Sequence, residues 1–245
     1  MENLDLQNLT KKERKALKRQ MKDERKETIF AARKRKKIIG WGLLGATALF
    51  IIFIIVWFAK NSGNGDFTFE LDAQNPQRGA AETAVVIREF SDFQCPACRA
   101  FSFNINQFMK EYGGKVKHIF YDFPLPIPTH KNSLGASMAA RCAEAQGNFW
   151  GYHDILFDRQ KNWETLQNPD DVFVGYAKEL NLDENALRVC LNEKRYEGVV
   201  KKNLDKANEL GLNSTPTIFI NDKKFRGVLS VDDLKKEVDL LLNRE

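Results

Sequence analysis

Histidine and cysteine, the residues that most often hold metals, are scarce in this 245-residue chain, which has three of the first and four of the second. The histidines, His118, His130 and His153, are not spaced as a metal site; we interpret His118 as a structural strand residue and His130 as a polar loop residue. Cys95 and Cys98 form a close pair, but zinc normally needs a second one and none is present. The sequence therefore predicts no metal centre and no prosthetic group.

The net charge of +5 is unevenly distributed. Residues 1–37 carry 14 Lys and Arg against 6 Asp and Glu, whereas the remainder carries 24 against 27. This basic tail has no aromatic residue before Phe30 and no recognisable binding module, so we predict no nucleic-acid partner. We interpret the tail as solvated, with attraction to anionic inner-leaflet lipids as the alternative.

Charged residues are absent from residues 38–59, an apolar run of 22 residues with Trp41 and Trp57 near its ends. As a helix it would be about 33 Å long, enough to cross a hydrocarbon core of about 30 Å. The basic cluster at 33–37 predicts a cytoplasmic N-terminus and an uncleaved signal anchor, with residues 60–245 outside. A cleaved signal peptide is the alternative, but the run exceeds an h-region and no small-x-small site follows it closely. A buried core helix is less compatible with a run that is apolar all round.

Thiols are also absent from the tail, since all four cysteines follow the apolar run. Disulfides persist outside the cytoplasm. The distribution of cysteine therefore fits an oxidising compartment and favours redox chemistry.

The Cys95-Pro96-Ala97-Cys98 turn lies between an expected buried strand at 84–90 and an expected helix at 99–112. Thiols three residues apart on the first helical turn can close a disulfide. The free N–H groups and dipole of the helix favour a thiolate, so we expect Cys95 to have a lowered pKa. Pro96 suits the first helical position, where its missing N–H costs nothing. A zinc half-site and a structural disulfide are the alternatives.

Further elements can be placed by periodicity and by Gly and Pro. The strand at 84–90, the helix and a strand at 115–121 predict a right-handed parallel crossover. Residues 60–80 are assigned to a linker, with a short strand at 67–71. The remaining expected elements are helices at about 132–146, 149–160, 170–180, 183–191 and 195–210, a hairpin of strands at 217–220 and 224–228, and a helix at 231–243.

This order of elements and motifs resembles the thioredoxin superfamily, and most closely its DsbA-like thiol–disulfide oxidoreductases, over about residues 80–243. The matching segments are 89–98 around the cysteine pair, the connector at 122–125, the helices at 140–150, and Ser214-Thr215-Pro216-Thr217 before a strand. The resemblance implies an α/β fold class: a thioredoxin fold over 81–245 with a helical insertion at about 130–212, preceded by one N-terminal transmembrane helix.

The resemblance also implies catalytic roles. Cys95 would be the nucleophile that forms the mixed disulfide, and Cys98 the resolving partner. Glu89, six residues before Cys95, matches the family's buried acid and would relay protons to or from Cys98. The alternatives for Glu89 are an edge residue or a partner for Arg88.

Two further pairs of residues match positions with a role in the family. Thr215 and Pro216 match the cis-proline loop, which presents backbone groups to the substrate; an ordinary proline at strand entry is the alternative. Pro96 and Ala97 would tune the redox potential. Strong oxidants of the DsbA type commonly carry His where this chain has Ala97. Since Ala offers neither charge nor hydrogen bond, we predict a less oxidising couple, and the direction of electron flow stays open.

The second cysteine pair, Cys142 and Cys190, is placed in two expected helices of the insertion, 48 residues apart. On compartment grounds we predict a structural disulfide between them. Free buried cysteines and a redox shuttle to Cys95 and Cys98 are the alternatives.

Together these features predict a membrane-anchored oxidoreductase that introduces disulfides into exported proteins. The implied partners are reduced or unfolded exported proteins and a quinone-linked membrane oxidase of the DsbB or vitamin-K-epoxide-reductase type. A reductase or isomerase on the same scaffold is one alternative. A non-catalytic polypeptide-binding or chaperone module is another, against which the intact cysteine pair argues.

Overall fold

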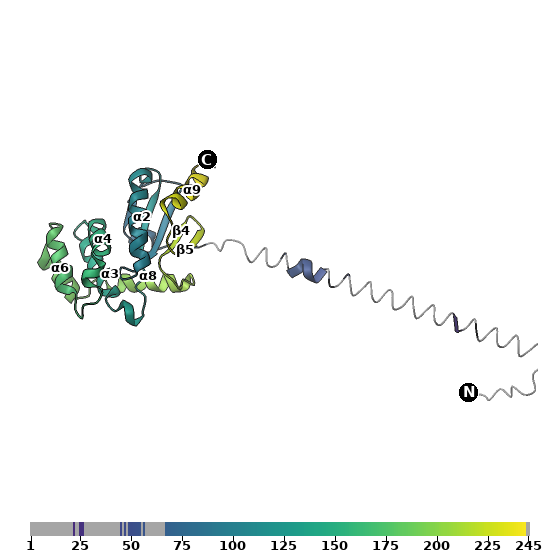
Figure 1. Cartoon of the computed structure of the whole chain (residues 1–245), viewed down its shortest axis with the longest axis horizontal. Helices are drawn as coiled ribbons and strands as arrows, with labels where there is room; N and C mark the ends of the chain where they lie inside the picture. The colour runs from purple at the N-terminus through teal and green to yellow at the C-terminus, as the bar shows by residue number, and fades with distance from the viewer. Residues whose placement is uncertain are drawn as a thin grey trace, which may run out of the picture. The chain divides into compact units, whose positions relative to one another are not determined.

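A computed structural model of the chain describes residues 67–243, together with residues 22, 25, 26, 45, 47, 49–54 and 56 (Figure 1). The chain divides into two units, Met1–Gly63 and Asn64–Glu245. Most of the apolar run at 38–59, and nearly all of the basic tail, lie outside the described residues. Among the described residues, no helix is both long and apolar enough to span a membrane. The signal anchor therefore stays a prediction.

The second unit is built on a five-stranded sheet of order β1-β3-β2-β4-β5. The strands are β1 (Gln77–Gly79), β2 (Val86–Ser91), β3 (Lys117–Asp122), β4 (Thr217–Ile220) and β5 (Lys223–Arg226). Strands β2 and β3 are parallel and joined through α2 (Pro96–Tyr112), whereas the other neighbours are antiparallel. The predicted parallel crossover between 84–90 and 115–121 is present.

Helices cover both faces of the sheet because successive residues of a strand point to opposite sides. Ile87 of β2 packs with Phe101 and Phe108 of α2, and with Leu234 of α9 (Val231–Leu242). Phe90 of β2 points to the opposite face of the sheet. It belongs to a second hydrophobic core, to which α8 (Glu197–Glu209) also contributes side chains. Glu89 and Ser91 share the Ile87 face, so they point toward the α2 side.

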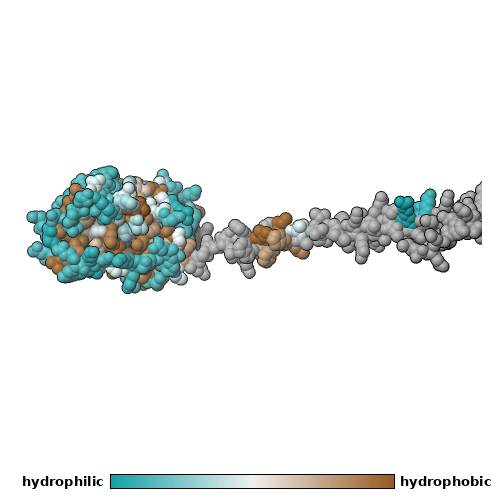
Figure 2. All heavy atoms as spheres, turned by 90° about the horizontal axis from the view of Figure 1, so that it is seen from below, coloured by the Kyte–Doolittle hydropathy of each residue, from teal (hydrophilic) through white to brown (hydrophobic). Residues whose placement is uncertain are grey.

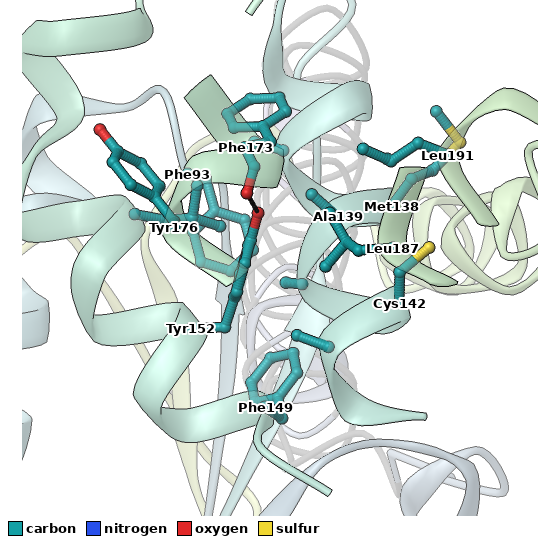
Figure 3. Packing of buried hydrophobic residues seen from close by; sticks show 14 of the residues in the cluster. Phe93, Met138, Ala139, Cys142, Phe149, Tyr152, Phe173, Tyr176, Leu187 and Leu191 are labelled. Carbon is teal, nitrogen blue, oxygen red and sulfur yellow. Dashed lines mark hydrogen bonds between the residues drawn. The ribbon is translucent and has the colours of Figure 1, made fainter. Parts of the chain in front are cut away.

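A helical block separates β3 from β4, as predicted for about 130–212. Its helices are α3 (Ser133–Glu144), α4 (Phe149–Asp158), α5 (Gln160–Trp163), α6 (Asp170–Glu179), α7 (Glu184–Asn192) and α8. Its core is aromatic: the Tyr152 hydroxyl donates to the Phe173 carbonyl oxygen at 2.7 Å, and both side chains are buried (Figure 3). Phe93 and Cys98 belong to this same core, so the block packs directly against the cysteine turn.

The Cys142–Cys190 disulfide joins α3 to α7, with the two Cα atoms 6.0 Å apart. Cys142 lies among Met138, Ala139 and Leu187 (Figure 3). The bridge therefore ties two helices of the insertion together rather than serving the CxxC turn.

Residues 67–80 differ from the prediction of a linker. Phe67 and Phe69 pack against Phe219, and β1 forms an edge of the sheet beside β3. The strand predicted at 67–71 is wrong: these residues form no strand, and a short 3-10 helix at Asp72–Gln74 follows them. Phe and polar residues alternate here because the single Phe67 and Phe69 rings pack onto the sheet. The alternation does not arise from strand pairing.

Candidate functional site

The cysteine pair lies where β2 gives way to α2. Cys95 caps the N-terminus of α2 in an extended conformation, and Pro96 opens the helix. The Cys95 backbone N–H donates to the Asp92 carbonyl oxygen at 3.0 Å, which closes the turn. Cys98 lies one turn into the helix and is fully buried, whereas Cys95 is 8 % exposed. Only Cys95 is therefore open to a substrate sulfur.

The surroundings shift the pKa values of the two thiols in opposite directions. A hydrogen bond from the Cys98 thiol lowers the pKa of Cys95 from 9.0 to about 5; burial opposes this, while the Thr215 side chain and the N–H groups of Cys98 and Ala97 assist. Burial raises the pKa of Cys98 well above 9.0, and the adjacent Cys95 adds to the rise. Cys95 is thus the stable thiolate and leaving group, and Cys98 the thiol that holds its proton.

The loop before β4 closes the site from the other side. The Thr215–Pro216 peptide bond is cis, and the Cys95 sulfur atom lies 3.6 Å from the Thr215 carbonyl oxygen. Thr215 is 9 % exposed. The structure thus brings Thr215 and Pro216 to Cys95 from a point 120 residues further along the chain.

Glu89 is fully buried, and burial raises the pKa of its carboxyl group. Its Oε2 atom is 2.9 Å from His118 Nε2, and the Arg78 Nε–H donates to His118 Nδ1 at 3.1 Å. Because Arg78 occupies Nδ1, the single imidazole hydrogen lies on Nε2 and is donated to Glu89. Burial lowers the pKa of His118 well below 6.5, which keeps the ring neutral.

His118 is therefore a partner of the buried acid, a role that the sequence prediction missed. Its position on β3 could have indicated it, because parallel pairing places His118 opposite Ile87, on the same face as Glu89. That inference needs the register of the pairing, which a single sequence does not supply.

His130 was also missed. Its Nδ1 atom lies 2.8 Å from Asp92 Oδ2, and this hydrogen bond, followed by the charges of Asp92 and Cys95, raises the pKa of His130 against the effect of burial. Gln94 connects the cysteine turn with the loop that carries His130, since its side-chain amide donates to the Thr129 carbonyl oxygen at 3.0 Å. The loop between β3 and α3 thus holds the His130 imidazole beside the cysteine turn. Nothing in the spacing of the sequence indicates this contact.

A groove of about 390 Å³ opens next to this loop. It is lined mainly by apolar side chains of the loop after β3, of α3 and of α8, among them Leu125, Ile127, Leu134, Val200 and Leu204. Figure 2 shows one face of the domain, where apolar residues gather inside a hydrophilic surround. Within the described part of the chain, no cluster of three or more His, Cys, Asp or Glu could hold a metal ion.

The described residues combine an accessible, acidic thiol, a buried resolving thiol, a carbonyl group at the cis-proline loop and a buried acid. This set can break and form a disulfide without a cofactor: one sulfur accepts attack, the second accepts the electron pair, and the buried acid supplies a proton.

The profile of the family described as Thioredoxin matches residues 72–240. Among curated proteins, the chain is 25% identical to a probable disulfide bond formation protein D of Bacillus anthracis over 215 residues, 85% of this chain and 98% of the relative. It is 30% identical to the Na(+)/H(+) antiporter NhaA 3 of Salinispora tropica over 161 residues, 66% of this chain. Those residues make up 24% of the antiporter, so the chain spans about a quarter of such relatives.

Solved structures show the same fold. Oxidised BdbD from Bacillus subtilis matches with a TM-score of 0.62 and 25% identity, over 70% of this chain and 94% of that one. The alpha-DsbA1 of Wolbachia pipientis matches with a TM-score of 0.61 and 24% identity, over 69% and 92%. The described domain thus has the thioredoxin-like fold of these proteins.

Proposed function

The chain belongs to the thioredoxin family, and from this premise we propose that it is a DsbA-like enzyme that introduces disulfide bonds into exported proteins. The opposite acidities of Cys95 and Cys98 carry the proposal. A nucleophilic cysteine of low pKa stabilises the reduced enzyme and so makes its disulfide an oxidant. A pKa of about 5 for Cys95 lies between the values of about 7 for thioredoxin and about 3.5 for DsbA.

The reaction starts with the Cys95–Cys98 disulfide. A substrate thiolate attacks Cys95 Sγ, the bond between the two cysteines breaks, and its electron pair passes to Cys98 Sγ, which takes up a proton. A second substrate thiolate then attacks the substrate sulfur of the mixed disulfide. Cys95 leaves as a thiolate, the substrate is oxidised by two electrons, and the enzyme is reduced.

Other residues position the substrate and move the proton. Thr215 and Pro216 lie against Cys95, where the Thr215 backbone can hold the substrate chain by hydrogen bonds. Buried Glu89, on the strand that leads into the cysteine turn, serves as the proton store for Cys98. The reduced pair must then return its two electrons to an oxidant, for which we propose a quinone-linked membrane oxidase of the DsbB or vitamin-K-epoxide-reductase type.

The location is part of the proposal. The apolar run at 38–59 and the basic cluster at 33–37 support a single-pass anchor with a cytoplasmic N-terminus and an extracytoplasmic catalytic domain. Such a location suits the Cys142–Cys190 disulfide.

The test uses the full chain in detergent, oxidised and mixed with a reduced, unfolded substrate protein that contains two cysteines. We expect stoichiometric loss of substrate thiols. Cys95→Ser and Cys98→Ser should each abolish it, because neither variant can form the Cys95–Cys98 disulfide that accepts the two electrons. Failure of the wild-type protein to oxidise the substrate would refute the proposal.

A reductase or isomerase is the second candidate, and Ala97 is the observation that favours it. The in-cell state of the pair separates the two candidates. Trapping thiols with acid and alkylating them should find Cys95 and Cys98 mostly oxidised in an oxidase, and mostly reduced in a reductase or isomerase.

A further inference from the structure

Three of the buried polar atoms without a hydrogen-bond partner, Glu89 Oε1, Ser91 Oγ and His153 Nε2, belong to residues that interact electrostatically, since Ser91 and His153 both act on the Glu89 carboxyl. All three residues are fully buried. Buried polar atoms are nearly always paired, so three unpaired ones in one neighbourhood call for a functional explanation. This inference rests on the proposed function, because it concerns the proton that Cys98 gains and loses.

Ser91 stands between the acid and the buried thiol. Glu89 and Ser91 are two residues apart on β2, so their side chains share one face of the sheet. The residue after Ser91 donates its backbone N–H to Cys98 Sγ at 3.5 Å. The Ser91 side chain lies near enough to both groups to lower the pKa of Glu89 and of Cys98, against the larger effect of burial on each. A hydroxyl both donates and accepts, so it can pass a proton between them.

One carboxyl oxygen of Glu89, Oε2, is held in a hydrogen bond that cannot pass a proton onward. Oε2 accepts from His118 Nε2, and the other nitrogen of that ring accepts from Arg78 Nε. Since arginine stays protonated, His118 Nδ1 cannot take a second hydrogen without losing that bond. The His118 branch therefore fixes the carboxyl group in place, and only Oε1 is free to exchange protons.

His153 can carry a proton between Glu89 and solvent. Its Nδ1 atom is 2.8 Å from Asp154 Oδ1, so the hydrogen lies on Nδ1 and Nε2 keeps a bare lone pair inside the domain. His153 lies close enough to Glu89 that its electrostatic effect is the largest of those that lower the pKa of that carboxyl against burial. The Asp154 side chain is 48 % exposed, and Asn106 holds it with a hydrogen bond of 2.9 Å.

We propose that Ser91 is a catalytic residue that transfers the proton between Cys98 and Glu89, and that His153 and Asp154 connect Glu89 with solvent. When the substrate thiolate breaks the Cys95–Cys98 bond, Cys98 Sγ receives the electron pair and takes a proton from Ser91 Oγ. Glu89 Oε1 returns a proton to Ser91. In the oxidised enzyme the hydrogen of His153 lies on Nε2; His153 gives it to Glu89 while Nδ1 takes up a proton at Asp154, which leaves the Nδ1–H form that the structure has with both cysteines free. Reoxidation runs the same transfers in reverse, so atoms and charge balance without a further reactant.

The charged and titratable groups that face Glu89 come from four elements. They are Arg78 on β1, His118 on β3, and His153 and Asp154 on α4, with Cys98 on α2 reached through Ser91. The pH dependence of the transfer therefore belongs to the group as a whole, which is why the test compares rates across pH rather than at one value.

The experiment measures how fast dithiothreitol reduces the Cys95–Cys98 disulfide of the full chain between pH 5 and 8, by quenching and alkylation. Ser91→Ala should slow the reaction at least about 10-fold, since general acid catalysis commonly contributes more than this. Ser91→Thr, which keeps the hydroxyl, should recover most of the rate. The matched control is Ser137→Ala, which removes another buried, unpartnered hydroxyl in α3 and should stay within twofold of wild type.

His153→Phe keeps the aromatic packing but removes the ring nitrogens. It should slow reduction as well, and the Ser91→Ala/His153→Phe double variant should be no slower than the slower single variant, because both act on one route. A wild-type rate in Ser91→Ala, or additive effects in the double variant, would overturn the inference.

Two safeguards keep the outcome clear. If Ser91→Ala does not fold, Asp154→Asn at the exposed end replaces it, and an unchanged rate there overturns the route. If wild type and Ser137→Ala both fail to exchange disulfides, the proposed function itself falls; if they exchange normally and Ser91→Ala matches them, only the inference about Ser91 falls.

Discussion

The side chain at position 97 can tune how strongly Cys95 is held as a thiolate. The Cys98 thiol and the N–H groups at the start of α2 already lower the pKa of Cys95 to about 5, while the side chain at position 97 adds neither charge nor hydrogen bond. Across the CxxC family a more acidic nucleophile accompanies a more oxidising disulfide. Position 97 is therefore the place where the potential can be raised without disturbing the fold, because its side chain is only partly buried.

Ala97→His should make the disulfide more oxidising by about 30 mV or more, a tenfold change in the equilibrium constant. An imidazolium beside Cys95 stabilises the thiolate and hence the reduced enzyme. The measurement is the equilibrium of Cys95 and Cys98 with a glutathione buffer. Ala97→Gln, similar in length but uncharged, is the control. An unchanged or lower potential in the His variant would show that charge at this position does not tune the pair.

Glu89→Gln should change stability in a pH-dependent way. Burial raises the pKa of Glu89 above 4.5, so the wild-type carboxyl favours the folded state fully below pH 4.5 and loses that contribution as pH rises through the folded-state pKa. The variant cannot ionise. Its free energy of unfolding should exceed that of wild type by about 1–3 kcal/mol at pH 8 and approach it at pH 4.

Denaturant titrations at the two pH values measure this difference. Glu82→Gln, at an exposed position, is the control and should stay within about 0.5 kcal/mol of wild type at both. A Glu89→Gln variant less stable than wild type at pH 8 would mean that the ionised carboxyl is stabilised in the fold.

Residues that lie in a segment matching a family motif were predictable, including distant Thr215 and Pro216, whereas residues outside such segments were not. Cys95 and Cys98 are related by their spacing, and Glu89 was assigned because the segment at 89–98 resembles the family motif. His118 reaches the site only because β3 pairs with β2. His130 reaches it only because the loop after β3 folds back onto the cysteine turn. Those contacts depend on register and loop path, which hydrophobic periodicity does not encode.

At the scale of elements, the disulfide between α3 and α7 closes a loop of 48 residues. Closing a loop of this size typically stabilises a domain by about 2–4 kcal/mol. Cys142→Ala/Cys190→Ala should lower the free energy of unfolding by that amount. The comparison is made in a Cys95→Ser/Cys98→Ser background, so that no other disulfide can form.

Urea unfolding without reductant gives the free energies of both proteins. Adding reductant to the parent should reproduce the loss, which provides an internal control. A difference below about 0.5 kcal/mol would indicate that packing of α3 on α7 holds the helices without the bond.

Helices and strands with strong periodicity were predicted to within a few residues, as at 170–180 for α6 and 183–191 for α7. The helix predicted at 149–160 is two, since α4 ends at Asp158 and α5 begins at Gln160. Buried Gln160 turns inward to donate to the Phe93 carbonyl oxygen at 2.8 Å. The edge strand β1 escaped prediction because it has three residues, too few for a period of two to show.

For the whole molecule, the predicted orientation rests on the asymmetry between the basic tail and the remainder of the chain. A membrane-impermeant maleimide applied to intact cells or spheroplasts after mild reduction should label Cys95, and a cysteine introduced by Thr10→Cys should react only after lysis. Labelling in the opposite order, or labelling of both sites before lysis, would contradict the predicted topology.

The bridge between α3 and α7 has a consequence for how a population of these molecules is made. A newly synthesised copy cannot complete its own domain until something oxidises Cys142 and Cys190. If the proposed activity holds, mature copies can do this for new ones, and maturation becomes autocatalytic. The first molecules in a cell that has none would then mature slowly and later ones quickly, so the appearance of folded protein after induction would show a lag that added mature domain removes.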